Sequence, residues 1–229
     1  MLHGSNLHYL PLAPLFFSAL VVIFGLLLAA LQVGVLSYAY EKMGVRGRYV
    51  YGLLLLSLFG SYVNIPIAEL HGPERGVEQE FSLMGVRYVV PATAERPDTI
   101  LAINLGGAII PTALSLYLMR KNEIFLRGTL GMLIVALVVH PLAQPIHGKG
   151  IAVPIIVPPL LAALVGTLLS HRAAAPLAYV AGSLGTLLGA DLMNLHNLAD
   201  LGAPIASIGG AGTFDGIFLT GILAVLLAH

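Results

Sequence analysis

The sequence of this protein has no cysteine, no tryptophan and few charged residues. Without cysteine, the chain cannot form disulfides, thiolate-ligated zinc sites or iron–sulfur clusters, and it cannot use a cysteine nucleophile. Lysine plus arginine equal aspartate plus glutamate at 11 each, so the positive excess of a nucleic-acid-binding protein is missing. Only 10% of the 229 residues are charged, against about 25% in soluble domains. This charge content excludes an ordinary water-soluble surface.

Apolar residues dominate instead, at 58% of the chain and a mean hydropathy of +0.92. We therefore predict an all-α integral membrane protein in contact with the lipid bilayer, with about seven transmembrane helices in one polytopic domain, 1–229. Backbone groups in lipid must be paired internally, which favours helices. The seven apolar segments are residues 14–39, 50–69, 99–119, 129–144, 152–170, 175–193 and 213–228. Prolines in the fifth segment predict a kink or break there.

Basic residues predict the orientation of the segments, because cytoplasmic loops are enriched in lysine and arginine. Alternate loops carry basic residues: Lys42, Arg46 and Arg48, then Arg120, Lys121 and Arg127, then His171 and Arg172. This pattern predicts a multi-pass protein of the cell membrane with its N-terminus outside and its C-terminus in the cytoplasm. The acidic insertion 71–98 then lies outside, and the apolar runs on either side of Gly85 predict a small β-hairpin in it, between helices 2 and 3.

Two features inside the segments predict helix contacts. Gly182, Gly185 and Gly189 form a small-residue stripe, which favours tight helix packing over close approach to a substrate. Asn104, beside Gly106 and Gly107, marks an irregularity in the third segment. We expect its amide to be hydrogen-bonded to a neighbouring helix.

Two aspartates are the most informative polar residues. Asp191 ends the sixth segment and Asp215 begins the seventh. Consecutive antiparallel helices place both on the outer side at similar depth. A carboxylate in the hydrocarbon layer costs roughly several kcal/mol, so it is usually paired or functional. Two adjacent carboxylates that share a proton can activate water as in aspartyl proteases, or can bind a cation or carry protons.

The loop between the two aspartates is rich in glycine. Gly209, Gly210 and Gly212 permit unusual backbone angles, and Thr213 is a suitable helix N-cap. Asp215 could therefore simply stabilise a helix start. Asp191 sits at a helix C-terminus, which repels an acid, so it needs a hydrogen-bonded partner such as Asn194 or Thr213.

A divalent metal site is the alternative interpretation of the same region; the hydrolase interpretation needs no cofactor. His196 and Asp200 are four residues apart and could join Asp191 and Asp215 as ligands. The other histidines predicted on the outer side are His71, His140 and His147.

The second half of the chain resembles an uncharacterised prokaryotic integral-membrane family known as domain of unknown function 1614. The matching stretches are Asn104-Leu-Gly-Gly-Ala, Gly150-Ile-Ala-Val-Pro, Gly185-Thr-Leu-Leu-Gly-Ala-Asp and Gly209-Gly-Ala-Gly-Thr-Phe-Asp-Gly-Ile-Phe-Leu-Thr-Gly. This resemblance implies a prokaryotic cell membrane and no particular activity.

A second resemblance is to the presenilin and signal-peptide-peptidase proteases, whose second catalytic aspartate lies in Gly-x-Gly-Asp. Here the matching stretch is Gly212-Thr-Phe-Asp, with Phe214 in place of the second glycine. The resemblance implies catalytic roles for Asp191 and Asp215 in cleaving a peptide within the membrane. The alternatives are a cation- or proton-coupled transporter or metal-binding membrane protein, and a non-catalytic scaffold.

Overall fold

The computed structural model describes residues 14–71, 79–83, 86–90, 98–146, 150–198, 205–210 and 216–229. Most of them are helical. The helices are α1 (Pro14–Lys42), α2 (Gly47–Gly60), α3 (Ile110–Lys121), α4 (Phe125–Leu142), α5 (Val157–Leu169), α6 (Ala174–Thr186), α7 (Leu195–Leu198) and α8 (Gly216–Leu227). Short π-helical or 3-10 segments are η1 (Leu105–Ile109), η2 (His171–Ala173), η3 (Leu187–Asp191) and η4 (Leu192–Asn194).

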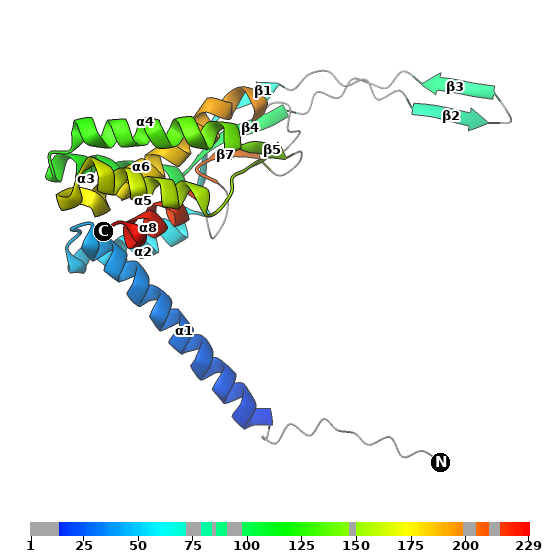
Figure 1. Ribbon diagram of the computed structural model, residues 1–229. Coiled ribbons are helices and arrows are strands. Elements are labelled where there is room, and N and C mark those ends of the chain that lie inside the picture. The colour runs from blue at the N-terminus through cyan, green and yellow to red at the C-terminus, as the bar shows by residue number, and fades with distance from the viewer. Residues whose placement is uncertain are drawn as a thin grey trace, which may run out of the picture.

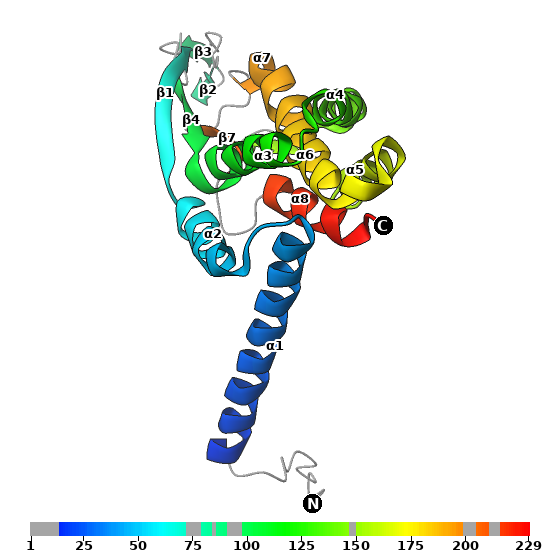
Figure 2. The ribbon, with the colours of Figure 1, turned by 90° about the vertical axis from the view of Figure 1, so that its left-hand side faces the viewer.

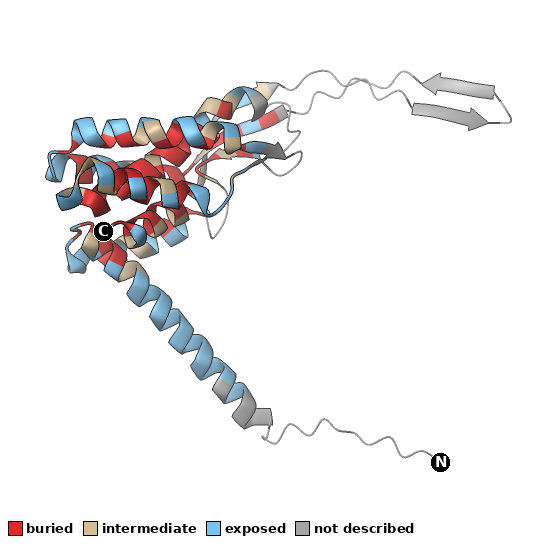
Figure 3. Ribbon diagram, viewed as in Figure 1, coloured by how far each residue is buried: buried red, intermediate tan, exposed pale blue. Residues whose placement is uncertain are grey.

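Helix α6 is the centre of the bundle. It packs against α3, α4, α5 and α8, and all of its residues except Leu184 are buried (Figure 3). Its glycines allow this packing: a Cβ at Gly185 would lie 2.6 Å from Cβ of Val135 on α4. The helix-packing interpretation of the glycine stripe is therefore confirmed.

Helix α1 leaves the bundle at an angle and touches it only near its C-terminal end (Figures 1 and 2). There Lys42 Nζ donates hydrogen bonds to the carbonyl oxygens of Ala228 at 2.6 Å and Leu226 at 3.4 Å, just beyond and at the end of α8. A cation is favourable at a helix C-terminus because the last carbonyls have no partner within the helix. This contact fixes the start of the α1–α2 connection beside the C-terminus of the chain.

Three helical segments are long and apolar enough to cross a membrane: Val21–Lys42, Phe125–Leu142 and His171–Asn194. Helices α2, α5 and α8 are apolar but have 14, 13 and 12 residues, so they extend about 18–21 Å against a hydrocarbon core of about 30 Å. The structure therefore confirms a largely helical chain with candidate membrane spans. It does not confirm seven complete spans.

The prediction of an all-α chain holds only in part: the described chain is mostly helical, but strands occupy parts of two predicted helices. Strands β1 (Asn64–His71), β4 (Asp98–Asn104) and β7 (Ile205–Ile208) form one sheet in that order, with β1–β4 antiparallel and β4–β7 parallel. The backbone N–H and C=O groups of these strands are therefore hydrogen-bonded between segments rather than within one helix. Strands β5 (Gln144–Ile146) and β6 (Gly150–Ala152) form a separate pair. The break expected at the prolines of the fifth segment is confirmed, since β6 ends before them and α5 begins at Val157.

The hairpin predicted between helices 2 and 3 is also confirmed. Strands β2 (Gln79–Leu83) and β3 (Val86–Val90) pair antiparallel, with Leu83 opposite Val86. Figure 1 shows that the described strands β1, β4, β5 and β7 lie at one end of the bundle, whereas the α1–α2 and α3–α4 connections and the C-terminus lie at the other.

Candidate functional site

Asp191 lies where the long helical run of α6 and η3 ends. Its side chain is half-buried, and its Oδ2 accepts a hydrogen bond of 2.7 Å from the backbone N–H of Gly209. The expectation that Asp191 needs a hydrogen-bond donor is met by Gly209, a residue that was not the expected partner. In the described part of the chain, the second oxygen Oδ1 has no hydrogen-bond partner, so it can receive a proton, a water molecule or a cation.

Gly209 directly follows strand β7 and begins a tight turn. Its φ is +91° and that of Gly210 is +78°, in the left-handed region that glycine favours. A Cβ at Gly209 would lie 2.6 Å from the backbone nitrogen of Ala108, so the turn rests directly on the π-helical turn η1. The unusual backbone angles expected for these glycines are confirmed at Gly209 and Gly210.

A buried asparagine organises the other side of this turn. The Asn104 Oδ1 accepts the N–H of Gly107 at 2.8 Å, and Nδ2 donates to the Ser61 carbonyl at 2.7 Å and to Asn64 Oδ1 at 3.0 Å. Asn104 has no exposed surface, so these bonds replace water that the side chain has lost. The predicted amide contact to a neighbouring helical segment and the predicted irregularity are both confirmed.

Ser207 connects this network to the glycine turn. Its hydroxyl lies 2.6 Å from Asn64 Oδ1 and 2.8 Å from the carbonyl oxygen of Gly210, and its single proton serves one of them at a time. The polar centre thus consists of Asp191, the Gly209–Gly210 turn, Ser207, Asn64 and Asn104. Sequence reasoning missed Asn64 and Ser207, because the strands that bring them together are far apart in the chain.

A second polar contact closes the end of η3. The amide nitrogen Nδ2 of Asn194 lies 2.9 Å from the Ala190 carbonyl oxygen, 3.0 Å from that of Gly189 and 3.2 Å from Nδ1 of His140 on α4. The amide therefore binds carbonyls at the end of the π-helical turn and ties them to α4. This is the role that the structure shows for His140.

Several predicted site residues lie outside the described part of the chain: Asp200, Gly212, Thr213, Asp215 and the outer-side histidine His147. The distance between Asp191 and Asp215 is accordingly not defined. His196 is in α7, directly after η4. Within the described residues, no group of three or more histidine, aspartate or glutamate side chains is placed to hold a metal ion. The four-residue metal site stays a prediction, as does the catalytic pair.

Described residues on both sides of Asp215 lie close to η3. On one side, Gly209 is hydrogen-bonded to Asp191. On the other, Ile217 in the first turn of α8 is buried in a cluster with Leu187, the first residue of η3, and Ala108 of η1. The two ends of the connection that contains Asp215 are thus anchored beside the helix that carries Asp191.

Comparison with known families identifies the chain. The model of a family described as protein of unknown function, DUF1614, matches residues 58–227. The protein belongs to the DUF1614 family. No curated protein and no solved structure gives a significant match.

The DUF1614 match covers the whole polar centre and leaves out α1. Every residue of that centre, from Asn64 to Gly210, falls within 58–227, as does the connection that contains Asp215. The splayed helix α1 and most of α2 precede the matched region. The family region is therefore the sheet, the bundle around α6 and the site between them.

Proposed function

We propose that this DUF1614 protein is a multi-pass membrane protein with its N-terminus outside and its C-terminus in the cytoplasm. Large apolar side chains project from the bundle surface, including Leu27 of α1, Phe59 of α2, Leu137 of α4 and Leu164 of α5, each more than half exposed. Large apolar side chains exposed on four helices favour contact with lipid. The basic end of the bundle then faces the cytoplasm, and the polar centre and the hairpin β2–β3 lie on the outer side.

For activity, we propose hydrolysis of a peptide bond within the membrane, with Asp191 and Asp215 as the catalytic pair. One observation carries this proposal: the Asp191 carboxylate is held by the residue that directly follows β7, which pairs only with β4 in the described part of the chain. An edge strand can pair with an extended peptide through its unpaired backbone groups. A peptide added to β7 would then run towards the Asp191 carboxylate.

The chemistry requires two carboxyl groups in different protonation states. The ionised one removes a proton from water, whose oxygen attacks the carbonyl carbon, while the protonated one donates to the carbonyl oxygen. The tetrahedral intermediate then loses the amine, which takes up a proton as the C–N bond breaks. The carbonyl carbon becomes a carboxylic acid, and one water molecule is consumed.

The test is cleavage of a reporter peptide with one membrane-spanning segment by the purified full-length protein in lipid vesicles. Asp191→Asn and Asp215→Asn should each abolish cleavage, because asparagine can neither remove nor supply the required proton. The matched control is Glu69→Gln, which changes an exposed carboxylate on β1 and should cleave at the parent rate. Unchanged cleavage by both aspartate variants would overturn the proposal.

A cation- or proton-coupled transporter is the second candidate, because helical interruptions beside a polar site are typical of transporters. The π-helical turns η1 and η3 both adjoin the Gly209 turn, and Asp191 Oδ1 is without a partner among the described residues.

A metal-binding version of this second candidate predicts that the purified protein contains a bound divalent metal, which Asp191→Asn or His196→Ala removes. Metal-free wild-type protein at neutral pH would contradict that version. If the protein is instead a non-catalytic scaffold, Asp191→Asn and Asp215→Asn would change its stability and nothing else.

A further inference from the structure

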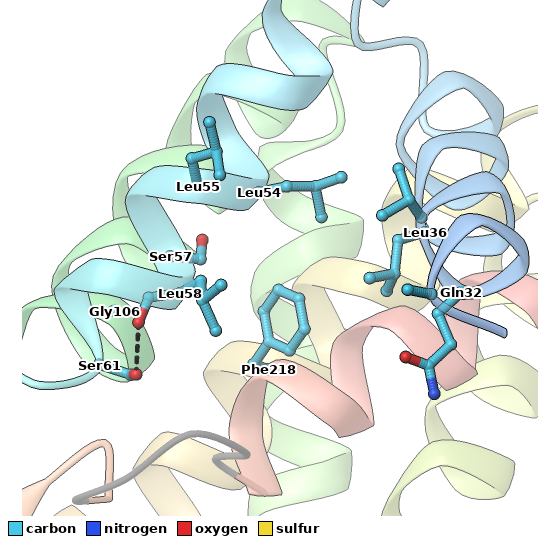
Figure 4. A pocket seen from close by; sticks show the side chains of 11 residues that line it. Gln32, Leu36, Leu54, Leu55, Ser57, Leu58, Ser61, Gly106 and Phe218 are labelled. Carbon is cyan, nitrogen blue, oxygen red and sulfur yellow. Dashed lines mark hydrogen bonds between the residues drawn. The ribbon is translucent and has the colours of Figure 1, made fainter. Parts of the chain in front are cut away.

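The two π-helical turns beside the Gly209 turn are held to the bundle in different ways. Turn η1 is held by backbone packing, because a Cβ at Gly106 would collide with the Ser57 carbonyl oxygen and the Ser61 nitrogen at the end of α2. Figure 4 shows Gly106 beside Ser61 at the wall of an apolar cavity of about 250 Å³, and none of the residues that line this cavity is titratable. The contact that holds η1 therefore does not depend on pH.

The end of η3 is held by a histidine instead. About one turn beyond the close contact of Gly189 with α4, the amide nitrogen Nδ2 of Asn194 lies 3.2 Å from the imidazole Nδ1 of His140. His140 is in the last turn of α4, and the next residue is Pro141. Proline has no N–H to bond to the carbonyl four residues earlier, so this turn has one helical hydrogen bond fewer. The side-chain contact thus joins η3 to a weakened helix end.

The neighbouring carbonyl groups determine which way the Asn194 amide is turned. The atom that faces His140 also lies 2.9 Å from the Ala190 carbonyl oxygen and 3.0 Å from that of Gly189. An amide oxygen in this place would face two carbonyl oxygens and could bond to neither of them. The amide nitrogen therefore occupies it, with one hydrogen directed to the carbonyls and the other to His140.

This orientation determines where the His140 ring carries its proton. An N–H directed at Nδ1 requires Nδ1 to accept, so the ring is neutral and its proton is on Nε2. A second proton on the ring would place two N–H groups against each other. Turning the Asn194 amide over would relieve this clash, but it would break the bonds to the Gly189 and Ala190 carbonyls. Neither orientation of the amide satisfies all three contacts once His140 is charged.

We propose that His140 is a proton-sensitive positioning residue for Asp191. In its neutral form it holds the end of η3 against α4, and its protonation releases this end, so that the Asp191–Gly209 hydrogen bond loses the support of α4. Histidine is the side chain whose charge ordinarily changes between pH 5 and pH 8, so acidification of the outer side causes the release. The inference rests on the proposed function only for its effect on activity, since the release itself is a property of the fold.

Few other titratable side chains lie on the elements packed against α4. Helix α5 has none, and the others are Tyr179 of α6, Asp191 of η3, and Tyr117, Arg120 and Lys121 of α3. Tyrosine, lysine and arginine ordinarily keep their charge between pH 5 and pH 8. Asp191, and His196 of α7 just beyond Asn194, are therefore the groups whose titration must be separated from that of His140.

The test is hydrogen exchange of the backbone amides of residues 187–194, measured by mass spectrometry on the full chain in phosphatidylcholine nanodiscs. The protection factor is the exchange rate of the unfolded peptide divided by that of the protein at the same pH. In the wild type it should be about fivefold lower at pH 5 than at pH 8, because one net hydrogen bond is lost. Residues 157–169 of α5 should show equal protection at both pH values.

His140→Asn places an amide oxygen where the imidazole Nδ1 accepts, and this oxygen takes up no proton. Its protection factor should keep the wild-type value of pH 8 at both pH values, whereas His140→Leu, which has no acceptor, should show the low value at both. The control variants Asp191→Asn and His196→Asn should keep the wild-type difference.

Three results would overturn the proposal: equal protection of wild-type residues 187–194 at the two pH values, an unchanged difference in His140→Asn, or loss of the difference in either control variant. A fall of the same size in α5 would show general loosening of the bundle and would overturn it as well. Hydrogen exchange needs no peptide cleavage, so these results are independent of whether the protein is a hydrolase.

Discussion

The polar centre depends on single residues whose replacement leaves buried groups unpaired. Asn104→Ala removes the bonds to the Gly107 N–H, the Ser61 carbonyl and Asn64. Each abandoned buried group carries a desolvation cost, so we expect a loss of about 2–4 kcal/mol in the free energy of unfolding. The measurement is an unfolding titration with sodium dodecyl sulfate in mixed micelles.

The matched control for this variant is Asn122→Ala. Asn122 is exposed and its amide donates one bond, of 2.9 Å, to the Leu118 carbonyl, so its loss should change stability by about 0.5 kcal/mol or less. Equal effects of the two variants would contradict the central place of Asn104.

Gly209 is sensitive for a different reason, which is space and backbone conformation. In Gly209→Ala, the added Cβ would lie 2.6 Å from the Ala108 nitrogen and 2.7 Å from the Ala108 Cβ, and the residue keeps a φ of +91°. Overlap and strain together should cost about 2–4 kcal/mol and displace the N–H that binds Asp191.

Gly216→Ala is the control for Gly209→Ala, because a Cβ at Gly216 meets nothing within 4 Å. It should unfold at the parent surfactant concentration or slightly above it. A Gly209→Ala protein as stable as Gly216→Ala would show that the turn does not rest on η1.

Residue-level reasoning from the sequence was most successful where the partner is near in the chain. Asn104 and Gly107 are three residues apart, so an irregularity there could be predicted. Asp191 and Gly209 are eighteen apart, and their contact depends on how the chain between them turns back. No spacing rule covers such a contact, so the need for a partner was predictable and its identity was not.

At the scale of elements, the sequence located apolar segments better than it identified their conformation. The predicted helix 50–69 contains most of α2, which ends at Gly60, and most of β1. A short apolar run is compatible with a buried helix or a strand, and only pairing with another segment decides. Strand β1 includes β-branched Ile65 and Ile67 and also Pro66, which point away from a continuous helix. The parallel pairing of β4 with β7 joins residues about a hundred positions apart.

The close packing of η3 against α4 leads to a prediction at this scale. A Cβ at Gly189 would lie 2.5 Å from the Ala136 carbonyl oxygen, so Gly189→Ala must push the two elements apart. We expect a destabilisation of about 1–3 kcal/mol, measured by the same surfactant titration.

The matched control for Gly189→Ala is Gly34→Ala on α1, where the new methyl group meets nothing within 4 Å. That variant should be neutral or slightly stabilising, because alanine is the better helix former. Equal stability of the two variants would contradict the close η3–α4 contact as the cause of any destabilisation.

At the scale of the whole molecule, the bundle has two unlike ends. The basic connections meet at one end, where Lys121 Nζ also donates to the Gly44 carbonyl, and the sheet and the polar centre occupy the other. The charge pattern of the sequence predicted this division correctly, because the basic loops that it assigned to one side of the membrane lie at the same end of the bundle. Which of the two ends faces the cytoplasm is inferred from the positive-inside rule alone.

That orientation can be measured with single cysteines, because the chain has none of its own. Glu69→Cys lies on β1 at the sheet end, and Arg172→Cys lies in η2 near the basic end; both positions are exposed. In intact cells, a membrane-impermeant maleimide should label Glu69→Cys and leave Arg172→Cys unlabelled, and after lysis both should react. Labelling of Arg172→Cys alone in intact cells would invert the topology and place the Asp191 centre on the cytoplasmic side. Labelling of both positions in intact cells would contradict separation of the two ends by a membrane, and with it the proposed membrane-spanning arrangement.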